Sequence, residues 1–323
     1  MIQESFQRYL EAFADQSTAI QTLEIAILVP GIVLFLFWGW QFSKDRFDPA
    51  ATADRWMGRP SRAIPIGTVG DALFMFAVTY VIRMVLVRLA FGLGYIEIPP
   101  SGEEPSEAQM VSNQIPLFFA VVFTMIASVV GVIGLMAARM QLKFLAVAGR
   151  LGLKISGSDV VLGLKAALLI LPPVIFVSEL LELVVPYEHP VIDSLAKLES
   201  PLAIGCVFLT TAFLTPIYEE LLFRGLLLGG LDRTIHLARL GRDPGNVDSK
   251  KSDPEFRGEA FAPVWVSALA FAAMHWGQGA APVPLFILAL GLGFLAQRTG
   301  SLIPSIVIHA TLNLLALIIV MIR

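Results

Sequence analysis

Residues 214–230 read LTPIYEELLFRGLLLGG, an apolar run that contains two adjacent glutamates and an arginine. Two later apolar runs also contain polar groups: residues 269–279, LAFAAMHWGQG, and residues 302–320, LIPSIVIHATLNLLALIIV. A charged side chain at the centre of a bilayer costs about 2.5 to 3.5 kcal/mol on insertion scales. Because such a cost needs a compensating benefit, we expect the polar groups of these three runs to have a function.

The composition is that of a membrane protein. Of the 323 residues, 56% are hydrophobic and only 15% are charged, and the mean hydropathy is +0.75. About a quarter of the residues of a soluble domain are charged, so the chain is too apolar for that class. The single cysteine, Cys206, excludes an intrachain disulfide. Residues 1–19 are polar, so we expect no cleavable signal peptide.

The apolar runs predict the fold class. A helix needs about 20 apolar residues to cross the hydrocarbon, which predicts an all-α, polytopic transmembrane helical bundle of about eight spans. The expected spans are residues 22–41, 68–95, 116–138, 160–180, 201–230, 262–279, 282–297 and 301–322. Because the last three are short or joined by tight turns, seven spans with a re-entrant or broken helix form the alternative. We also expect Pro216 to kink the fifth span just before the glutamates.

The distribution of Lys and Arg predicts which side of the membrane each loop faces. The loops at 42–66, 139–158, 232–260 and 297–300 lie on one side and contain sixteen basic residues, whereas the opposite side contains three. Basic loops face the cytoplasm in most membrane proteins. We therefore predict a multi-pass integral membrane protein whose termini both lie outside.

The chain divides into two parts by the chemical variety of its polar residues. Residues 1–200 are predicted to be N-terminal transmembrane scaffold helices with about four spans. Residues 201–323 contain all three of the apolar runs with polar groups and are predicted to be the catalytic transmembrane core.

Spacing on a helix separates the roles of the two glutamates. Glu220 and Arg224 are four residues apart, so they share a helix face and can form an ion pair. Glu219 points about 100° away from Glu220, which leaves its carboxylate free to face a cavity and act as a base. The alternative is a purely architectural ion pair that locks two helices together.

Two histidines and an asparagine in the later runs are expected to meet the glutamates. At 1.5 Å per residue, Glu219, His275 and His309 lie about 13 to 20 Å from the basic side of the membrane, in one layer. His309 and Asn313 are four residues apart, and both can donate a hydrogen bond to the oxyanion formed on a peptide carbonyl. Trp276, which follows His275, could line the pocket or pack at a helix interface, and we expect packing.

A zinc site is the alternative use of the same side chains. Catalytic zinc sites often contain two His and one Glu, and Glu219, His275 and His309 supply that set. Residue spacing does not choose between zinc and a metal-free site. The chain has no H-E-x-x-H, G-x-S-x-G or G-x-G-D motif, and the absence of a Walker loop excludes ATP-driven transport.

Three short motifs occur in order on these apolar runs: Glu219-Glu220-x-x-x-Arg224, Phe271-x-x-x-His275 and His309-x-x-x-Asn313. Together they resemble the motifs of the CPBP family of intramembrane peptidases, the CAAX protease and bacteriocin-processing (Abi) family. This family includes the CAAX prenyl endopeptidases of the Rce1 type and many bacterial relatives. The segment GFLAQRTGSLIPSIVIH, residues 293–309, also resembles the family's lead into its last motif. The resemblance covers residues 200–320 and leaves residues 1–200 without a signature.

The resemblance implies an α-helical membrane endopeptidase. It implies that Glu219 activates water together with His275, and that His309 and Asn313 stabilise the oxyanion. The other two charged residues of the first motif are implied to support them. Family members are commonly labelled metalloproteases, whereas a metal-independent glutamate mechanism has been argued for the prenyl-protein enzymes. Zinc therefore stays an alternative, and no other cofactor is expected.

The expected partners are a peptide or membrane-protein substrate and the lipid bilayer, with no nucleic acid. Prenyl-CAAX cleavage is a eukaryotic activity within the family, while bacterial relatives are associated with bacteriocin self-immunity, peptide maturation or regulated proteolysis. Nothing in the chain favours the eukaryotic branch. We therefore expect an enzyme of the bacterial inner (cytoplasmic) membrane.

Two other functional classes are open at this point. A proton- or ion-coupled transporter could use the buried Glu and His as a relay, with Asp71, Arg83, Arg88 and Lys165 of the early spans on its path. A transporter should, however, spread its polar groups through both halves of the chain. The third class is a noncatalytic peptide-binding immunity protein, for which we would expect an incomplete motif set.

Overall fold

The computed structural model describes residues 18–46, 48, 51–52, 55, 63–97, 106–182, 184–185, 201–242, 256 and 261–322. Every regular element in these ranges is a helix, and none is a strand. This confirms the predicted all-α fold class. Large apolar side chains are exposed on the outer helices, with Leu73 and Phe123 as examples. An extensive apolar exterior is expected for a surface that faces lipid.

Six helices in the described part are long and apolar enough to cross a membrane. They are α2 (Thr18–Lys44), α4 (Val69–Gly92), α5 (Glu107–Met140), α7 (Gly157–Glu182), the continuous helical run Pro201–Arg239, and α13 (Pro282–Thr299). Two shorter apolar helices are α12 (Phe261–Ala273) and α14 (Ile303–Ile322). Each predicted span therefore coincides with an apolar helix, and the short α6 (Phe144–Arg150) lies in a predicted loop.

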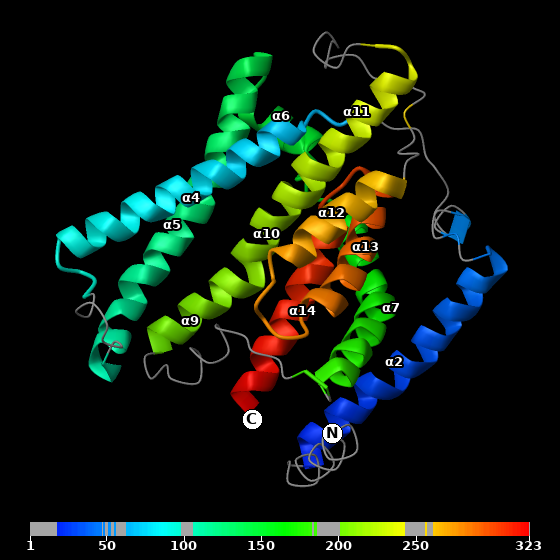
Figure 1. Cartoon of the computed structure of the whole chain (residues 1–323), viewed down its shortest axis with the longest axis horizontal. Coiled ribbons are helices and arrows are strands. Elements are labelled where there is room, and N and C mark those ends of the chain that lie inside the picture. Colours follow the sequence, from blue (N-terminus) through cyan, green and yellow to red (C-terminus); the bar gives the residue numbers. More distant parts are fainter. Residues whose placement is uncertain are drawn as a thin grey trace.

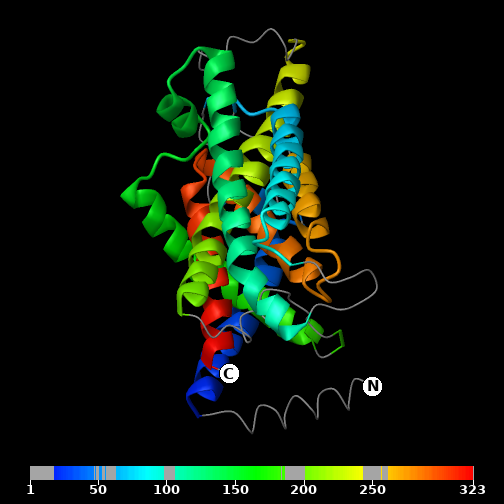
Figure 2. The ribbon, with the colours of Figure 1, turned by 90° about the vertical axis from the view of Figure 1, so that its left-hand side faces the viewer.

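Figure 1 shows α4 and α5 at one side of the bundle and α2 and α7 at the other, with the remaining long helices between them. Both α2 and α14 pack on α7, and α12 packs on α13. The helices extend side by side along the length of the molecule (Figure 2). The beginning of α2 and the end of α14 lie at the same end of the bundle, opposite α6 (Figure 1). This arrangement is what an even number of spans produces.

The central helical run contains two π-helical segments. In order it consists of α9 (Pro201–Leu209), η1 (Thr210–Leu214), α10 (Thr215–Glu220), η2 (Leu221–Leu228) and α11 (Gly229–Arg239). η1 lies immediately before Pro216, where we expected a kink, and its last turn is closed by a hydrogen bond from the Thr215 N–H to the Thr210 carbonyl. A π turn bonds each N–H to the carbonyl five residues earlier and often marks a functional site. The two π segments thus flank the short α10, which ends with the two glutamates.

Two predicted helix ends are wrong. The central run continues to Arg239 instead of ending near residue 230, because its polar continuation is stabilised by contacts such as those of Asp232 with Gln297, at 2.9 and 3.1 Å. α12 ends at Ala273 instead of residue 279, and residues 274–281 form turns. Gly277 and Gly279 have φ angles of 94° and 57° there, a conformation that glycine adopts without steric cost.

The apolar helix α12 is shorter than a full membrane span. Its 13 residues correspond to about 20 Å, which is less than the ~30 Å hydrocarbon thickness. Figure 1 places the turn between α12 and α13 part-way along the bundle. The chain therefore turns back there before it reaches the end where α14 finishes.

Glycines allow the N-terminal helices to approach the C-terminal ones closely. A Cβ at Gly163 of α7 would lie 2.7 Å from the Val307 Cβ of α14, and a Cβ at Gly230 of α11 would lie 2.4 Å from the Val69 N at the start of α4. Real Cβ atoms do not approach other atoms so closely. The predicted division at residue 200 thus separates two parts that pack tightly on each other.

The charged residues of the early spans do not form a path through the interior. Asp71 completes the N-terminal cap of α4 with Thr68 and forms an ion pair with Arg139 at 3.0 Å. Arg83 and Lys165 are exposed on the outer surfaces of α4 and α7. Their positions suit snorkelling toward an interface, and they give no support to the transporter interpretation.

Candidate active site

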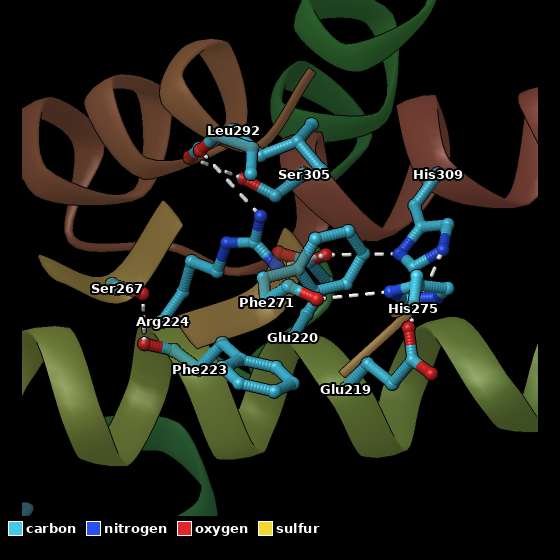
Figure 3. Close-up of polar contacts among 11 residues, drawn as sticks. Glu219, Glu220, Phe223, Arg224, Ser267, Phe271, His275, Leu292, Ser305 and His309 are labelled. Carbon is cyan, nitrogen blue, oxygen red and sulfur yellow. Dashed lines mark hydrogen bonds and ion pairs between the residues drawn. The ribbon is translucent and has the colours of Figure 1, made fainter. Parts of the chain in front are cut away.

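Glu220 connects two helices at the centre of the bundle. Its side chain and that of Arg224 are both fully buried, and Glu220 Oε1 lies 3.0 Å from Arg224 Nη1. The same oxygen accepts a hydrogen bond from Nδ1 of His309, also at 3.0 Å. The ion pair expected from the spacing is therefore present, and it also connects η2 and α10 to α14. Figure 3 shows this chain of contacts.

One aromatic ring packs against the arginine and both histidines of this cluster. Phe271 of α12 is completely buried, and the Arg224 guanidinium lies 4.6 Å from the centre of its ring. The ring centres of His275 and His309 lie 4.9 and 5.7 Å from that of Phe271. A cation over an aromatic face is stabilised by the ring quadrupole. Phe271 thus packs against the guanidinium and both imidazoles.

Glu219 differs from its neighbour in having an uncommitted carboxylate. Its side chain is 19% exposed, and Oε2 lies 3.6 Å from His309 Nε2, which is longer than a hydrogen bond. Oε2 is buried and has no hydrogen-bond partner among the described residues. A buried carboxylate oxygen without a partner is costly, which makes Glu219 a candidate for a functional role. Figure 3 shows Glu219 directed toward the two histidines.

His275 lies in the turn that follows α12, not within a helix as predicted. Its Nδ1 is 2.9 Å from the Phe271 carbonyl oxygen. A carbonyl can only accept a hydrogen bond, so Nδ1 carries the hydrogen. In the neutral ring Nε2 then has the lone pair and can accept a hydrogen bond.

His309 lies between the two glutamates and is hydrogen-bonded to one of them. Nδ1 donates to Glu220, and Nε2 faces Glu219. The ring can donate from Nε2 as well only when it is an imidazolium. Nε2 of His309 thus lies next to the Glu219 oxygen that has no hydrogen bond.

The side-chain amide of Asn313 is hydrogen-bonded to a residue outside this cluster. Its Nδ2 donates to the carbonyl oxygen of Thr211 in η1, at 2.8 Å. The side chain is partly exposed, and the contacts of the described residues include no hydrogen bond from it to Glu219, His275 or His309. The structure thus brings together both glutamates, Arg224 and both histidines, and leaves Asn313 attached to the neighbouring π turn.

Comparison with known families supports the recognition made from the motifs. Residues 201–315 match the family model described as Type II CAAX prenyl endopeptidase Rce1-like. This part of the chain is therefore similar to the Rce1-like family. The match covers 201–315 only, and it includes all three motifs. The comparisons with curated proteins and with solved structures found no match.

The Rce1-like match points to a protease that acts on a peptide in a membrane setting. Together with the apolar helices, it supports an integral, multi-pass membrane protein. It does not support a transporter or a noncatalytic peptide-binding protein.

The cluster of Glu219, Glu220, Arg224, His275 and His309, as arranged, does not form a three-ligand metal set. Among the described residues no three His, Cys, Asp or Glu side chains are grouped so that they could hold a metal ion. The Nδ1 atoms of His275 and His309 are each bonded to another group, so zinc would need both Nε2 atoms together with Glu219. We therefore derive no step through a metal.

Trp276 was expected to pack at a helix interface, and this prediction is wrong. Its side chain is 85% exposed. It lies in the turn after α12, where the backbone no longer follows the helical direction that the prediction assumed. Met274 in the same turn is 53% exposed, so this turn presents apolar side chains outward beside His275.

Sequence analysis missed a hydroxyl network directly beside Glu219. The Tyr218 hydroxyl of α10 donates to Thr79 Oγ1 of α4 at 3.0 Å, and Thr79 Oγ1 lies 2.9 Å from Ser128 Oγ of α5. Two further serines connect helices: Ser267 donates to the Phe223 carbonyl at 2.8 Å, and Ser305 to the Leu292 carbonyl at 3.0 Å. Both contacts appear in Figure 3. Hydroxyls on apolar spans are the only sequence signal for such contacts.

Proposed function

We propose that this protein is an intramembrane endopeptidase in which Glu219 activates a water molecule for attack on a peptide carbonyl. The observation that carries the proposal is the buried Oε2 of Glu219, which has no hydrogen bond and lies 3.6 Å from Nε2 of a histidine that a second glutamate holds in place. The Rce1-like match of residues 201–315 supports the same reaction class.

The first step is addition of water. Glu219 takes a proton from the water while the water oxygen forms a bond to the carbonyl carbon, and the carbonyl oxygen becomes an oxyanion. The free Nε2 of His275 accepts the second hydrogen of the water and thereby orients it. General-base catalysis of this kind contributes about 100- to 10,000-fold.

We assign stabilisation of the oxyanion to His309 and Asn313. His309 donates from Nε2, and its orientation is set by the hydrogen bond from Nδ1 to Glu220. Asn313 has a second amide hydrogen beyond the one given to Thr211, and we assign it the second donor. Removing one such donor typically costs about 100- to 1,000-fold in kcat.

Collapse of the intermediate completes the cycle. Glu219 gives its proton to the nitrogen of the scissile bond, the C–N bond breaks, and the products are a carboxylic acid and an amine. Glu220 and Arg224 do not touch the reacting atoms in this scheme. They position His309, and Phe271 packs against both imidazoles.

The membrane setting extends the proposal. We assign the basic loops to the cytoplasm and both termini to the outside, in a bacterial inner membrane, and we leave open whether the substrate carries a prenyl group. Single cysteines placed in a Cys206→Ser background, at Gly241 and at Tyr95 near the two ends of the bundle, test the orientation. A membrane-impermeant thiol reagent added to intact cells should label the second position and not the first.

The decisive test is peptide cleavage by the purified protein in detergent against a peptide library. Glu219→Gln removes the base with little change in size, and Glu182→Gln at the exposed end of α7 is the matched control. We expect cleavage by the wild type and by Glu182→Gln, and a loss of about 100-fold or more in kcat for Glu219→Gln. Equal rates for wild type and Glu219→Gln would remove the proposed base.

A further inference from the structure

Three consecutive residues of α10 have three different partners. Tyr218 bonds to Thr79 of α4, Glu220 bonds to His309 of α14, and Glu219 between them has the free carboxylate oxygen. Successive side chains on a helix point about 100° apart. Tyr218 and Glu220 therefore leave the helix on either side of Glu219, and each is held by a neighbouring helix.

α10 needs such external contacts because of its π-helical neighbours. It has only 6 residues and lies between η1 and η2. A π turn contains more residues than an α turn, so the rotation of α10 about its axis is not set by one uninterrupted i to i−4 ladder. The contacts of Tyr218 and Glu220 supply what that ladder would otherwise fix.

The hydroxyl network behind Tyr218 is partly buried, and its hydrogen bonds are satisfied. Ser128 is 1% exposed and donates to the Thr124 carbonyl at 2.7 Å, so its oxygen is available as an acceptor. Thr79 lies within reach of that oxygen, at 2.9 Å, and of the Met75 carbonyl, at 2.7 Å. Thr79 donates its single hydroxyl hydrogen to Ser128 Oγ or to the Met75 carbonyl. In both cases its oxygen can accept a hydrogen bond from the Tyr218 hydroxyl. A satisfied network of this kind is rigid.

We propose that Tyr218 is a positioning residue for the reaction, and that Thr79 and Ser128 hold its hydroxyl so that α10 presents the Glu219 carboxylate to His275 and His309. The N-terminal helices α4 and α5 thereby take part in catalysis without touching the substrate. This inference rests on the proposed role of Glu219.

Kinetics of four variants test the proposal. Tyr218→Phe and Thr79→Val each remove the hydrogen bond, Thr79→Ser keeps it, and Tyr80→Phe is the matched control because Tyr80 is 63% exposed on the same helix as Thr79. A misplacement of about 1 Å costs up to about 100-fold, so we expect kcat to fall about tenfold or more in Tyr218→Phe and Thr79→Val. KM should stay within about twofold, since binding of the substrate is not altered.

The conservative variant separates positioning from general destabilisation. Thr79→Ser should recover most of the kcat that Thr79→Val loses, and the double variant Tyr218→Phe/Thr79→Val should be no slower than either single variant, because both remove the same bond. Wild-type kcat in Tyr218→Phe, or a fall in kcat that Thr79→Ser shares, would overturn the proposal.

A second readout does not depend on activity. Hydrogen exchange of residues 215–220 should be faster in Tyr218→Phe than in wild type and unchanged in Tyr80→Phe. If the wild type cleaved no peptide, the proposed function would fail, but this measurement would still decide whether Tyr218 holds α10. Unchanged exchange in Tyr218→Phe would show that it does not.

Discussion

Arg224→Met removes one partner of the buried ion pair and keeps a side chain of similar length. In the structure, Arg224 and Glu220 are 3.0 Å apart and neither side chain is exposed. Without the guanidinium, the Glu220 carboxylate keeps only its hydrogen bond from His309. One carboxylate oxygen, Glu220 Oε2, already lacks a partner among the described residues. The substitution thus leaves a buried charge poorly compensated.

The expected cost follows from this burial. Breaking a buried ion pair by removing one partner typically costs about 3 to 5 kcal/mol. The double variant Glu220→Met/Arg224→Met removes both charges, and replacing such a pair by apolar groups is often neutral. His309 then loses its acceptor, which costs about 1 to 3 kcal/mol. We therefore expect the double variant to be more stable than Arg224→Met and less stable than wild type.

Stability and activity are measured separately on the same samples. Denaturant unfolding in micelles, followed by the fluorescence of the five tryptophans, gives the free energies of unfolding. Cleavage of a substrate peptide gives the rate. The double variant should recover stability without recovering activity, because His309 is no longer held by a carboxylate. Wild-type stability in Arg224→Met, or a double variant less stable than Arg224→Met, would refute the reasoning about the buried pair.

Three further outcomes are expected. A chelator should leave the cleavage rate of the purified protein unchanged, and a rate that falls with chelator and returns with zinc would contradict the metal-free scheme. Gly163→Ala should destabilise the protein by about 1 to 3 kcal/mol, because its Cβ would lie 2.7 Å from the Val307 Cβ, whereas Gly134→Ala, with no atom within 4 Å, should not. Gln297→Leu should cost about 1 to 3 kcal/mol, since it removes both hydrogen bonds to the buried Asp232; thermal unfolding measures both effects.

The fold class and the positions of the spans could be predicted because they depend on local composition. A run of about 20 apolar residues is a property of one segment, and each predicted span coincides with an apolar helix. The ends were less predictable. α12 stops at Ala273 because of the Gly277 and Gly279 turn, whereas hydropathy alone continued the span to residue 279.

Pairs within one helix could also be predicted, and pairs between helices could not. The bond between Glu220 and Arg224 follows from a spacing of four residues. The bonds from Tyr218 to Thr79 and from Glu220 to His309 join residues far apart in the sequence. Similar depth in the membrane suggested that Glu219 and His309 could meet, but depth says nothing about the direction in which each side chain points.

The direction in which a side chain points depends on how its helix is rotated about its own axis. For Glu219 this rotation is affected by the two π segments. An α-helix carries its side chains forward by about 100° per residue, so a pattern of apolar positions predicts one face. A π turn departs from that increment, and η1 and η2 occur immediately before and after the six residues of α10. The face on which Glu219 emerges is therefore determined by contacts with α4, α5 and α14 rather than by the apolar pattern of residues 201–230. Both halves of the chain therefore contribute to the proposed site. Glu219, the proposed base, belongs to the C-terminal half, whereas Thr79 and Ser128, which hold Tyr218 beside it, belong to the N-terminal half.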